Sequence, residues 1–501
     1  MNVRARLPAV FLALCLMLLV AIAASWSNPG LGEDEGLLLE YPQLIVHGEV
    51  PFRDFQSSYG PGTYLPLAAA YEVLGPSVTV ERAVGASYRL AIILAIGALL
   101  SPLGAAVTLC GGSMAVFGVL GEGPPTAFGW YAGLACALWA IWLARSALRR
   151  TSAGGNRRWA GAGRWAGAGL LIGATASIRP DLGAAALLAS LVLIAGAERR
   201  GRWSFAAGLA VGLAPLGWNL AAAGASSFWT YYVQARLHQQ PEAGFPLFSQ
   251  PAMLLTVVAG AAILLIAAIR EWRRRGAGPM TRCWLALGIL SVLLLPQFLQ
   301  RADPGHFGFV APVILGLLPW AASSVRRLSA RTRVAIPTLF ALLVGVHVIA
   351  AAFFVHGYTL RHGDRSFIVY SRRERIELQG VMRYVDRHTS QGQGIFVGPQ
   401  DLRTALWGET WLYYMLPTLQ PASFYLEFGP GDNTTSFTAR ISSELKHSEI
   451  LILESVPARV RRAVYPYALA GSGRPNAIVA RYFRLGLQTG PYRVFLRDVP
   501  A

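Results

Sequence analysis

Long apolar runs alternate with short polar segments over the first 356 residues of the chain. The runs fall at residues 8–24, 86–101, 103–120, 126–144, 165–178, 182–197, 203–223, 252–269, 283–299, 307–324 and 334–356. Their lengths approach the ~20 apolar residues that a helix needs to cross the hydrocarbon core of a bilayer. The pattern therefore predicts an α-helical polytopic membrane protein with about 11 transmembrane helices, the first of them uncleaved.

The composition supports a membrane protein. Of the 501 residues, 54% are hydrophobic and 14% are charged, whereas soluble chains carry about 25% charged residues. The net charge of +18 would suggest a nucleic-acid partner in a soluble protein, but here most of the arginines lie between the apolar runs. Topology explains the charge, and no nucleic-acid partner is predicted.

The arginines also predict the orientation of the chain. With the N-terminus in the cytoplasm, four arginine-rich loops at 145–164, 199–202, 270–282 and 326–333 all face the cytoplasm, as the positive-inside rule requires. The same threading places a first outer loop, residues 25–85, and everything after residue 356 on the extracytoplasmic face. We therefore predict a multi-pass protein of the cell membrane whose chemistry lies on its outer side.

The tail, residues 357–501, has a mixed and charged composition. Its pattern predicts helices at about 372–389, 409–416 and 436–446, and strands at 395–397, 423–428, 450–453 and 492–496. Strands alternating with helices are typical of an α/β domain. The chain thus divides into a membrane domain, 1–356, and a small extracytoplasmic α/β domain, 357–501.

The first outer loop carries three adjacent acids, Glu33, Asp34 and Glu35, and further on the turn Tyr59-Gly60-Pro61-Gly62. In one interpretation the acids are merely solvated and the glycines turn the chain. In the other, one carboxylate is a general base that deprotonates an acceptor hydroxyl at the membrane surface.

Three motifs of this loop carry a family resemblance. Asp-Glu-Gly follows the first apolar run, Gly-Glu-Val-Pro-Phe-Arg-Asp-Phe comes next, and Tyr-Gly-Pro-Gly ends the series. Together they resemble the first extracytoplasmic loop of polytopic GT-C glycosyltransferases, in the branch of protein O-mannosyltransferases and lipid A aminoarabinose transferases. The resemblance implies a GT-C-like fold and a donor sugar linked to a polyprenyl phosphate. The acceptor class does not transfer, because the tail does not resemble the β-rich modules of the mannosyltransferases.

The resemblance also implies roles for residues of the loop. Asp34 matches the motif aspartate and is the candidate catalytic base, with Glu35 as the competing base. Asp54 resembles a second acidic position that orients the acceptor or a metal, and Arg53 is placed to pair with it or with phosphate. A divalent cation stays an open possibility, with no certain cofactor.

A polyprenyl-phosphate donor needs positive charge at the site, which arginine supplies with bidentate geometry. Arg179, in Ile-Arg-Pro-Asp, interrupts an otherwise apolar stretch, where a charge is expensive. Pairing of Arg179 with Asp181 is the structural alternative to phosphate binding.

Further phosphate candidates are Arg301 and His306, in a sequence that resembles an Arg-x-Asp-x-x-His motif at the corresponding position of related transferases. A helix-capping turn is the alternative. Tyr59 and Arg82 complete the candidate substrate contacts, although Arg82 also fits an ordinary anchor at the membrane interface.

These features favour an integral membrane glycosyltransferase. It would move a sugar, with inversion, from a polyprenyl-phosphate donor to a glycan, lipid or protein hydroxyl of the cell envelope. Two other classes remain: a polytopic transporter or lipid flippase, and a non-catalytic envelope assembly protein. A transporter would carry ionisable groups at mid-membrane, whereas the charges here cluster near one face.

Overall fold

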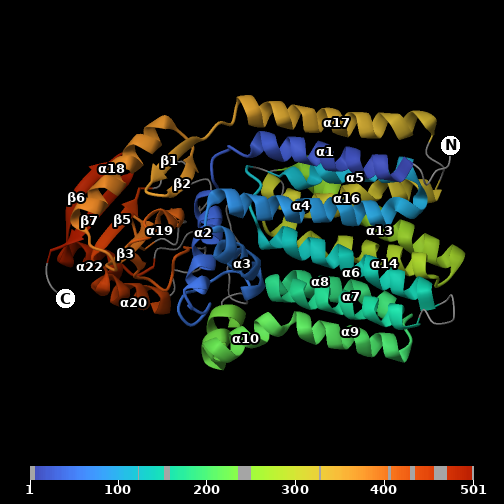
Figure 1. Cartoon of the computed structure of the whole chain (residues 1–501), viewed down its shortest axis with the longest axis horizontal. Helices are drawn as coiled ribbons and strands as arrows, with labels where there is room; N and C mark the ends of the chain where they lie inside the picture. The colour runs from blue at the N-terminus through green and yellow to red at the C-terminus, as the bar shows by residue number, and fades with distance from the viewer. Residues whose placement is uncertain are drawn as a thin grey trace.

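The structure, a computed structural model, is a bundle of long helices joined at one end to an α/β domain (Figure 1). It describes residues 6–121, 123–151, 158–234, 250–325, 329–403, 408–428, 435–455 and 471–498. The N-terminus lies at the end of the bundle far from the α/β domain. This arrangement confirms the predicted fold class, a polytopic helical protein with a C-terminal α/β domain.

Helices lie at all the positions where the apolar runs predicted spans. They are α1 (Leu7–Ser25), α4 (Val78–Leu100), α5 (Ala105–Leu120), α6 (Gly129–Thr151), α7 (Arg158–Ile178), α8 (Pro180–Ile194), α9 (Arg199–Gly212), α10 (Ala214–Ala223), α13 (Pro251–Arg275), α14 (Pro279–Leu293), α15 (Leu295–Gln300), α16 (Pro304–Val325) and α17 (Ala330–Phe353). Several begin with proline at the first helical position, where no backbone N–H is needed.

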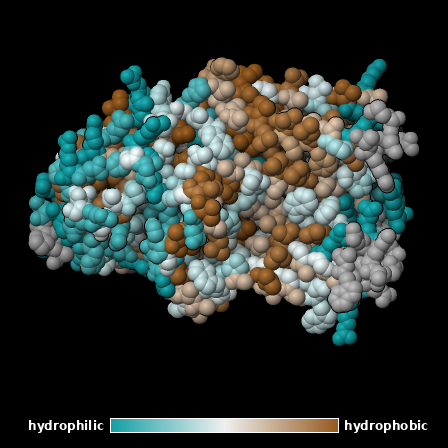
Figure 2. Space-filling model, in the orientation of Figure 1, coloured by the Kyte–Doolittle hydropathy of each residue, from teal (hydrophilic) through white to brown (hydrophobic). Residues whose placement is uncertain are grey.

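Within the described residues, seven helices are long and apolar enough to cross a membrane, and the bent pair α9 and α10, with 41° between its members, would make an eighth. Helices α5 and α8 are apolar but shorter. On the face shown in Figure 2, hydrophobic residues gather over the middle of the bundle and hydrophilic residues over the α/β domain. The chain is therefore a multi-pass membrane protein, and the count of eleven spans stays a prediction.

The α/β domain is built on a five-stranded sheet with strand order β4-β3-β5-β7-β6. Its strands are β3 (Gly394–Pro399), β4 (Gln420–Pro421), β5 (Ile450–Glu454), β6 (Phe483–Thr489) and β7 (Tyr492–Arg497). β3 pairs in parallel with β4 and β5, and β7 runs antiparallel to β5 and β6. Helices α18 (Arg372–His388), α19 (Trp411–Met415), α20 (Thr435–Glu444) and α22 (Arg474–Tyr482) and a hairpin of β1 (Tyr358–His362) and β2 (Arg365–Val369) complete the domain.

The first outer loop lies between the bundle and this domain (Figure 1). It forms α2 (Gly32–Val46) and α3 (Leu65–Leu74). Gly36 of α2 faces the backbone of α19 so closely that a Cβ would lie 2.3 Å from the nitrogen of Trp411. Trp411 in turn stacks on Phe367 with ring centroids 4.4 Å apart. One buried apolar cluster thus joins α2 and α3 to the α/β domain.

The strand predicted at 423–428 is wrong. This segment is irregular, and the short strand β4 ends before it at Pro421. Its backbone carbonyls bind neighbouring loops instead of a sheet. The N–H of Gln56 donates to the carbonyl of Phe424 at 2.7 Å, and the hydroxyl of Thr410 donates to the carbonyl of Leu426 at 3.1 Å. Apolar side chains here are buried by tertiary contacts, which the run of aromatic residues does not distinguish from strand pairing.

Because the outer loop and the tail lie at the same end of the bundle, we predict that both are accessible from the same side of the membrane. Cysteines placed at the exposed positions Glu72 and Arg383 should both react with a membrane-impermeant maleimide added outside intact cells, because both segments lie at one end of the bundle. A cysteine at the exposed Arg273, in a predicted cytoplasmic loop, should react only after the membrane is opened. Labelling of Glu72 and Arg383 from opposite sides would contradict the predicted threading.

Candidate active site

The three adjacent acids occupy the first turn of α2, where the positive end of the helix dipole favours carboxylates. Their environments differ: Glu35 is fully buried, Glu33 is half-buried and Asp34 is exposed. The Oε1 atom of Glu33 accepts a hydrogen bond from the backbone N–H of Phe428 at 2.7 Å. Of the three, Asp34 is therefore the carboxylate most accessible to a substrate.

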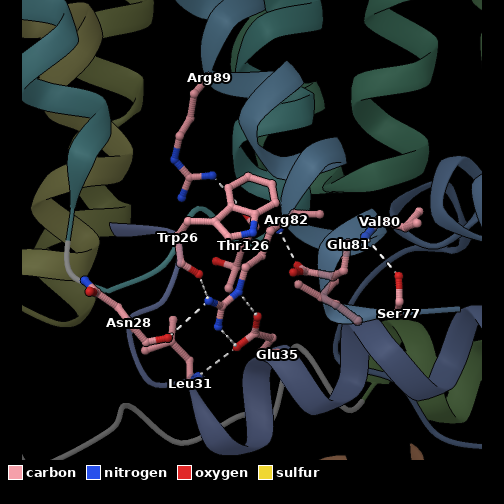
Figure 3. Close-up of polar contacts among 12 residues, drawn as sticks. Trp26, Asn28, Leu31, Glu35, Ser77, Val80, Glu81, Arg82, Arg89 and Thr126 are labelled. Atoms are coloured by element: carbon pink, nitrogen blue, oxygen red, sulfur yellow. Dashed lines mark hydrogen bonds and ion pairs between the residues drawn. The ribbon is translucent and has the colours of Figure 1, made fainter. Parts of the chain in front are cut away.

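Glu35 forms an ion pair with Arg82 of α4 (Figure 3). Nε of Arg82 donates to Oε1 of Glu35 at 2.7 Å, and Nη2 donates to Oε2 at 3.1 Å. Both side chains are fully buried. Nη1 of Arg82 donates to the carbonyl oxygens of Trp26 and Asn28. Arg82 thus ties the end of α1 and the start of α2 to α4, and its guanidinium faces protein groups.

We predict that breaking this buried ion pair destabilises the protein much more than breaking the exposed pair between Arg53 and Asp54. Arg82→Ala leaves Glu35 buried without its counter-charge, a change that costs about 3–5 kcal/mol in comparable pairs. Arg53→Ala breaks a pair whose arginine is half-exposed, and such pairs contribute little. Thermal unfolding in detergent should therefore show a clear loss of melting temperature for Arg82→Ala alone. Equal melting temperatures in both variants would contradict the prediction.

Arg179 lies between α7 and α8, next to polar and aromatic side chains. Its Nη2 atom lies 2.8 Å from Oδ2 of Asp181 and donates to Oε1 of Gln297 at 3.2 Å. The guanidinium carbon lies 5.1 Å from the ring centroid of Trp130 and 5.6 Å from that of Tyr59. Burial opposes the charged form, but the hydrogen bonds that Arg179 donates to the carboxylate of Asp181 raise the pKa of Arg179 above its ordinary value. A fixed cation therefore stands beside the first outer loop.

The turn Tyr59-Gly60-Pro61-Gly62 brings this loop to Arg179. The N–H of Gly60 donates to the carbonyl of Ile178 at 3.1 Å, and the hydroxyl of Thr63 donates to the same carbonyl at 3.2 Å. A Cβ on Gly60 would lie 2.2 Å from the carbonyl oxygen of Ser177. Glycine is required here because the two backbones touch, and the contact sets Tyr59 against the guanidinium.

Asp303 organises the Arg-x-Asp-x-x-His motif. Its Oδ2 atom lies 2.5 Å from Nε of Arg301, and its Oδ1 atom accepts from the backbone N–H of His306 at 2.7 Å and lies 3.0 Å from Nδ1 of that ring. Burial opposes ionisation, but the hydrogen bonds from His306 and the charge of Arg301 lower the pKa of Asp303 below its ordinary value. The capping alternative is thus present, and it also holds Arg301 and His306 together.

Aromatic rings connect Arg179 with His306. The ring of Phe309 lies 5.4 Å from that of His306 and 5.7 Å from that of Trp130. Because Trp130 also faces Arg179, these contacts form one continuous cluster from Arg179 to His306. The structure therefore brings together the phosphate candidates from two separate connections of the bundle.

Asp54 and Arg53 lie elsewhere on the outer loop and pair with each other. Nη2 of Arg53 lies 2.7 Å from Oδ2 of Asp54, which also accepts from the N–H of Val50 at 2.7 Å. The hydrogen bond from Arg53 lowers the pKa of Asp54, which keeps this carboxylate ionised. The neighbouring Phe52 is fully buried against Tyr232, with ring centroids 4.9 Å apart. The described contacts of the Arg53–Asp54 pair are thus with its own loop, and none joins it to Arg179.

Two functional-site contacts were missed by sequence reasoning. Gln297 follows a proline in an apolar helix, and a polar residue in such a helix was a usable signal. Glu427 of the α/β domain accepts from the N–H of Ser58 at 2.6 Å and so joins the tail to the outer loop. Its position in a run of aromatic residues carried no such signal, because the partner is 369 residues away.

The described residues contain no group of three or more histidine, cysteine or acidic side chains arranged to hold a metal ion. The four cysteines are unpaired thiols.

Comparisons with known proteins give structural matches alone. No protein-family model matches the sequence, and no curated protein matches it. ArnT from Cupriavidus metallidurans in the apo state superposes with a TM-score of 0.59 at 12% identity, covering 99% of this chain and 98% of that one. The same protein bound to undecaprenyl phosphate gives a TM-score of 0.56 at 12% identity, with 97% of each chain covered.

The archaeal oligosaccharyltransferase AglB from Archaeoglobus fulgidus, in complex with an inhibitory peptide and a dolichol-phosphate, also matches. Its TM-score is 0.51 at 11% identity, covering 97% of this chain and 74% of that one. ArnT and AglB are GT-C glycosyltransferases. The chain therefore has the GT-C fold, which confirms the fold that the motifs of the first outer loop implied.

Proposed function

We propose that the protein is an inverting membrane glycosyltransferase. It transfers a sugar from a polyprenyl-phosphate donor to a hydroxyl of an envelope glycan, lipid or protein on the extracytoplasmic face. The observation that carries the proposal is that the exposed carboxylate of Asp34 and the half-buried guanidinium of Arg179 both lie at the end of the bundle that holds the first outer loop, in a chain with the GT-C fold. The lipid phosphates named in the ArnT and AglB structures support this donor class.

A short series of contacts connects these two groups. Glu33, next to Asp34, binds the N–H of Phe428, and the adjacent Glu427 binds the N–H of Ser58. Ser58 precedes Tyr59, whose ring faces Arg179. A substrate that spans the outer loop between α2 and the Tyr-Gly-Pro-Gly turn would therefore meet a base at one end and a cation at the other.

In the proposed reaction, the acceptor oxygen attacks the anomeric carbon of the donor sugar. Asp34 takes the proton of the acceptor hydroxyl, and the bond from the anomeric carbon to the phosphate oxygen breaks. The electron pair leaves with the polyprenyl phosphate, whose growing charge Arg179 stabilises in a site of low dielectric. We assign Arg301 and His306 to the same phosphate, and Asp54 with Arg53 to orienting the acceptor.

Glu35 is a poorer base than Asp34 in this proposal. Both of its oxygens accept hydrogen bonds from Arg82, and both side chains are fully buried, so an acceptor hydroxyl does not reach this carboxylate unless the pair opens. Arg82 itself is assigned to holding the loop rather than to binding substrate. No divalent cation is included in the mechanism.

The proposal is tested by incubating the purified protein in detergent with a panel of polyprenyl-phosphate sugars and a cell-envelope extract that supplies acceptor hydroxyls. The expected result is release of polyprenyl phosphate with one donor class, in the wild type and not in Asp34→Asn. A lipid flippase would move the donor across a vesicle membrane without releasing lipid phosphate. Donor translocation without cleavage across the whole panel would overturn the proposal.

A further inference from the structure

We infer that Glu33 and Glu35 are positioning residues that fix Asp34 from opposite sides of α2. This inference rests on the proposed role of Asp34 as the base. The outer two acids contact different parts of the molecule, and the exposed Asp34 lies between them in the sequence.

Helix geometry places the outer acids on opposite sides. Consecutive side chains of an α-helix are separated by about 100°, so Glu33 and Glu35 point about 200° apart. Asp34 leaves the helix between them. The contacts agree with this geometry, because Glu33 binds the α/β domain while Glu35 binds α4 of the bundle.

The contacts of Glu35 restrain the helix on the bundle side. Arg82 grips both oxygens of Glu35, and the N–H of Leu31 donates to Oε2 at 3.2 Å. The same guanidinium binds the carbonyl of Asn28 at 3.1 Å. As Figure 3 shows, Arg82 thus joins the linker before α2 and its first turn into one unit.

The contact of Glu33 restrains the helix on the other side. Its Oε1 atom accepts from the N–H of Phe428 at 2.7 Å. In the reverse direction, Glu427 of the α/β domain accepts from the N–H of Ser58 in the outer loop. Each segment therefore holds the backbone of the other. Rotation of α2 about its axis would break either the Glu33 contact or the Glu35 pair, so the carboxylate of Asp34 keeps one direction.

If Glu33 is a positioning residue, its side-chain length and its hydrogen-bond acceptor should matter more for turnover than its charge. Glu33→Gln keeps the length and an oxygen that accepts from Phe428, so it should retain most of the turnover. Glu33→Asp keeps the charge but is one methylene shorter, and Glu33→Ala removes the acceptor. Both should lower kcat, by about 10- to 100-fold for Glu33→Ala, because small misplacements of a catalytic group are costly. The KM for the donor should change little.

The decisive measurement repeats Glu33→Ala in an Asp34→Asn background. A residue that acts through Asp34 has nothing left to position there, so the second substitution should cause no further loss of kcat. Glu72→Ala, an exposed acid of α3, is the matched control, and equal melting temperatures should show that the variants fold. If Glu33→Ala does not fold, the comparison of Glu33→Gln with Glu33→Asp carries the test.

Three results would overturn the inference. The first is an additive loss of kcat in the double variant, and the second is a wild-type kcat in Glu33→Ala. The third is a Glu33→Asp variant as active as wild type together with an impaired Glu33→Gln variant, which would show that the charge of Glu33 matters and its position does not. Failure of the proposed function has a different signature, namely full turnover in Asp34→Asn itself, and the positioning inference would then fail with it.

Discussion

Asp34→Asn should lower turnover by about 10²- to 10⁴-fold, the contribution typical of a general base. The substitution preserves the shape of an exposed side chain and removes its basicity, so folding and donor binding should stay close to wild type. Release of polyprenyl phosphate at saturating donor and acceptor measures the effect.

The control for this prediction is Glu35→Gln at equal expression. Because this change weakens a buried ion pair with Arg82, it should lower the melting temperature, and its turnover must be compared per folded molecule. A near-wild-type rate in Asp34→Asn with a loss in Glu35→Gln would transfer the role of base to Glu35. Full activity in both variants would exclude the proposed mechanism.

Arg179→Ala should weaken binding of a polyprenyl phosphate by about 10- to 100-fold. This estimate follows from the roughly 1.5–3 kcal/mol of a hydrogen bond to a charged group, at 1.4 kcal/mol for each factor of ten in Kd. Arg179→Lys should recover only part of the affinity, because an ammonium lacks the bidentate geometry of a guanidinium. Equilibrium binding in detergent measures both variants.

Arg403→Ala is the matched control, since Arg403 forms a half-exposed pair with Asp401 in the α/β domain. This substitution should leave the affinity for polyprenyl phosphate unchanged. Arg301→Ala should resemble Arg179→Ala if both arginines hold one phosphate. Wild-type affinity in both Arg179→Ala and Arg301→Ala would remove these residues from the donor site.

The positions of the helices, and the placement of the outer loop and the tail at the same end of the bundle, could be predicted from the sequence. Each depends on local information, because a span must hold enough consecutive apolar residues by itself. The motifs around Asp34 and the Tyr-Gly-Pro-Gly turn were also continuous in the chain, and so they were recognisable before the fold was known.

The contacts and burial that distinguish the three acids were decided by the tertiary structure alone. Glu35 meets Arg82 across 47 residues and Glu33 meets Phe428 across 395, so no local pattern distinguishes them from Asp34. The segment 423–428 shows the same limit, since its aromatic residues predict a strand while its backbone binds the outer loop. Burial and pairing of a side chain depend on which distant segments pack against it, and in this protein the α/β domain and the bundle meet at the turn that carries Asp34.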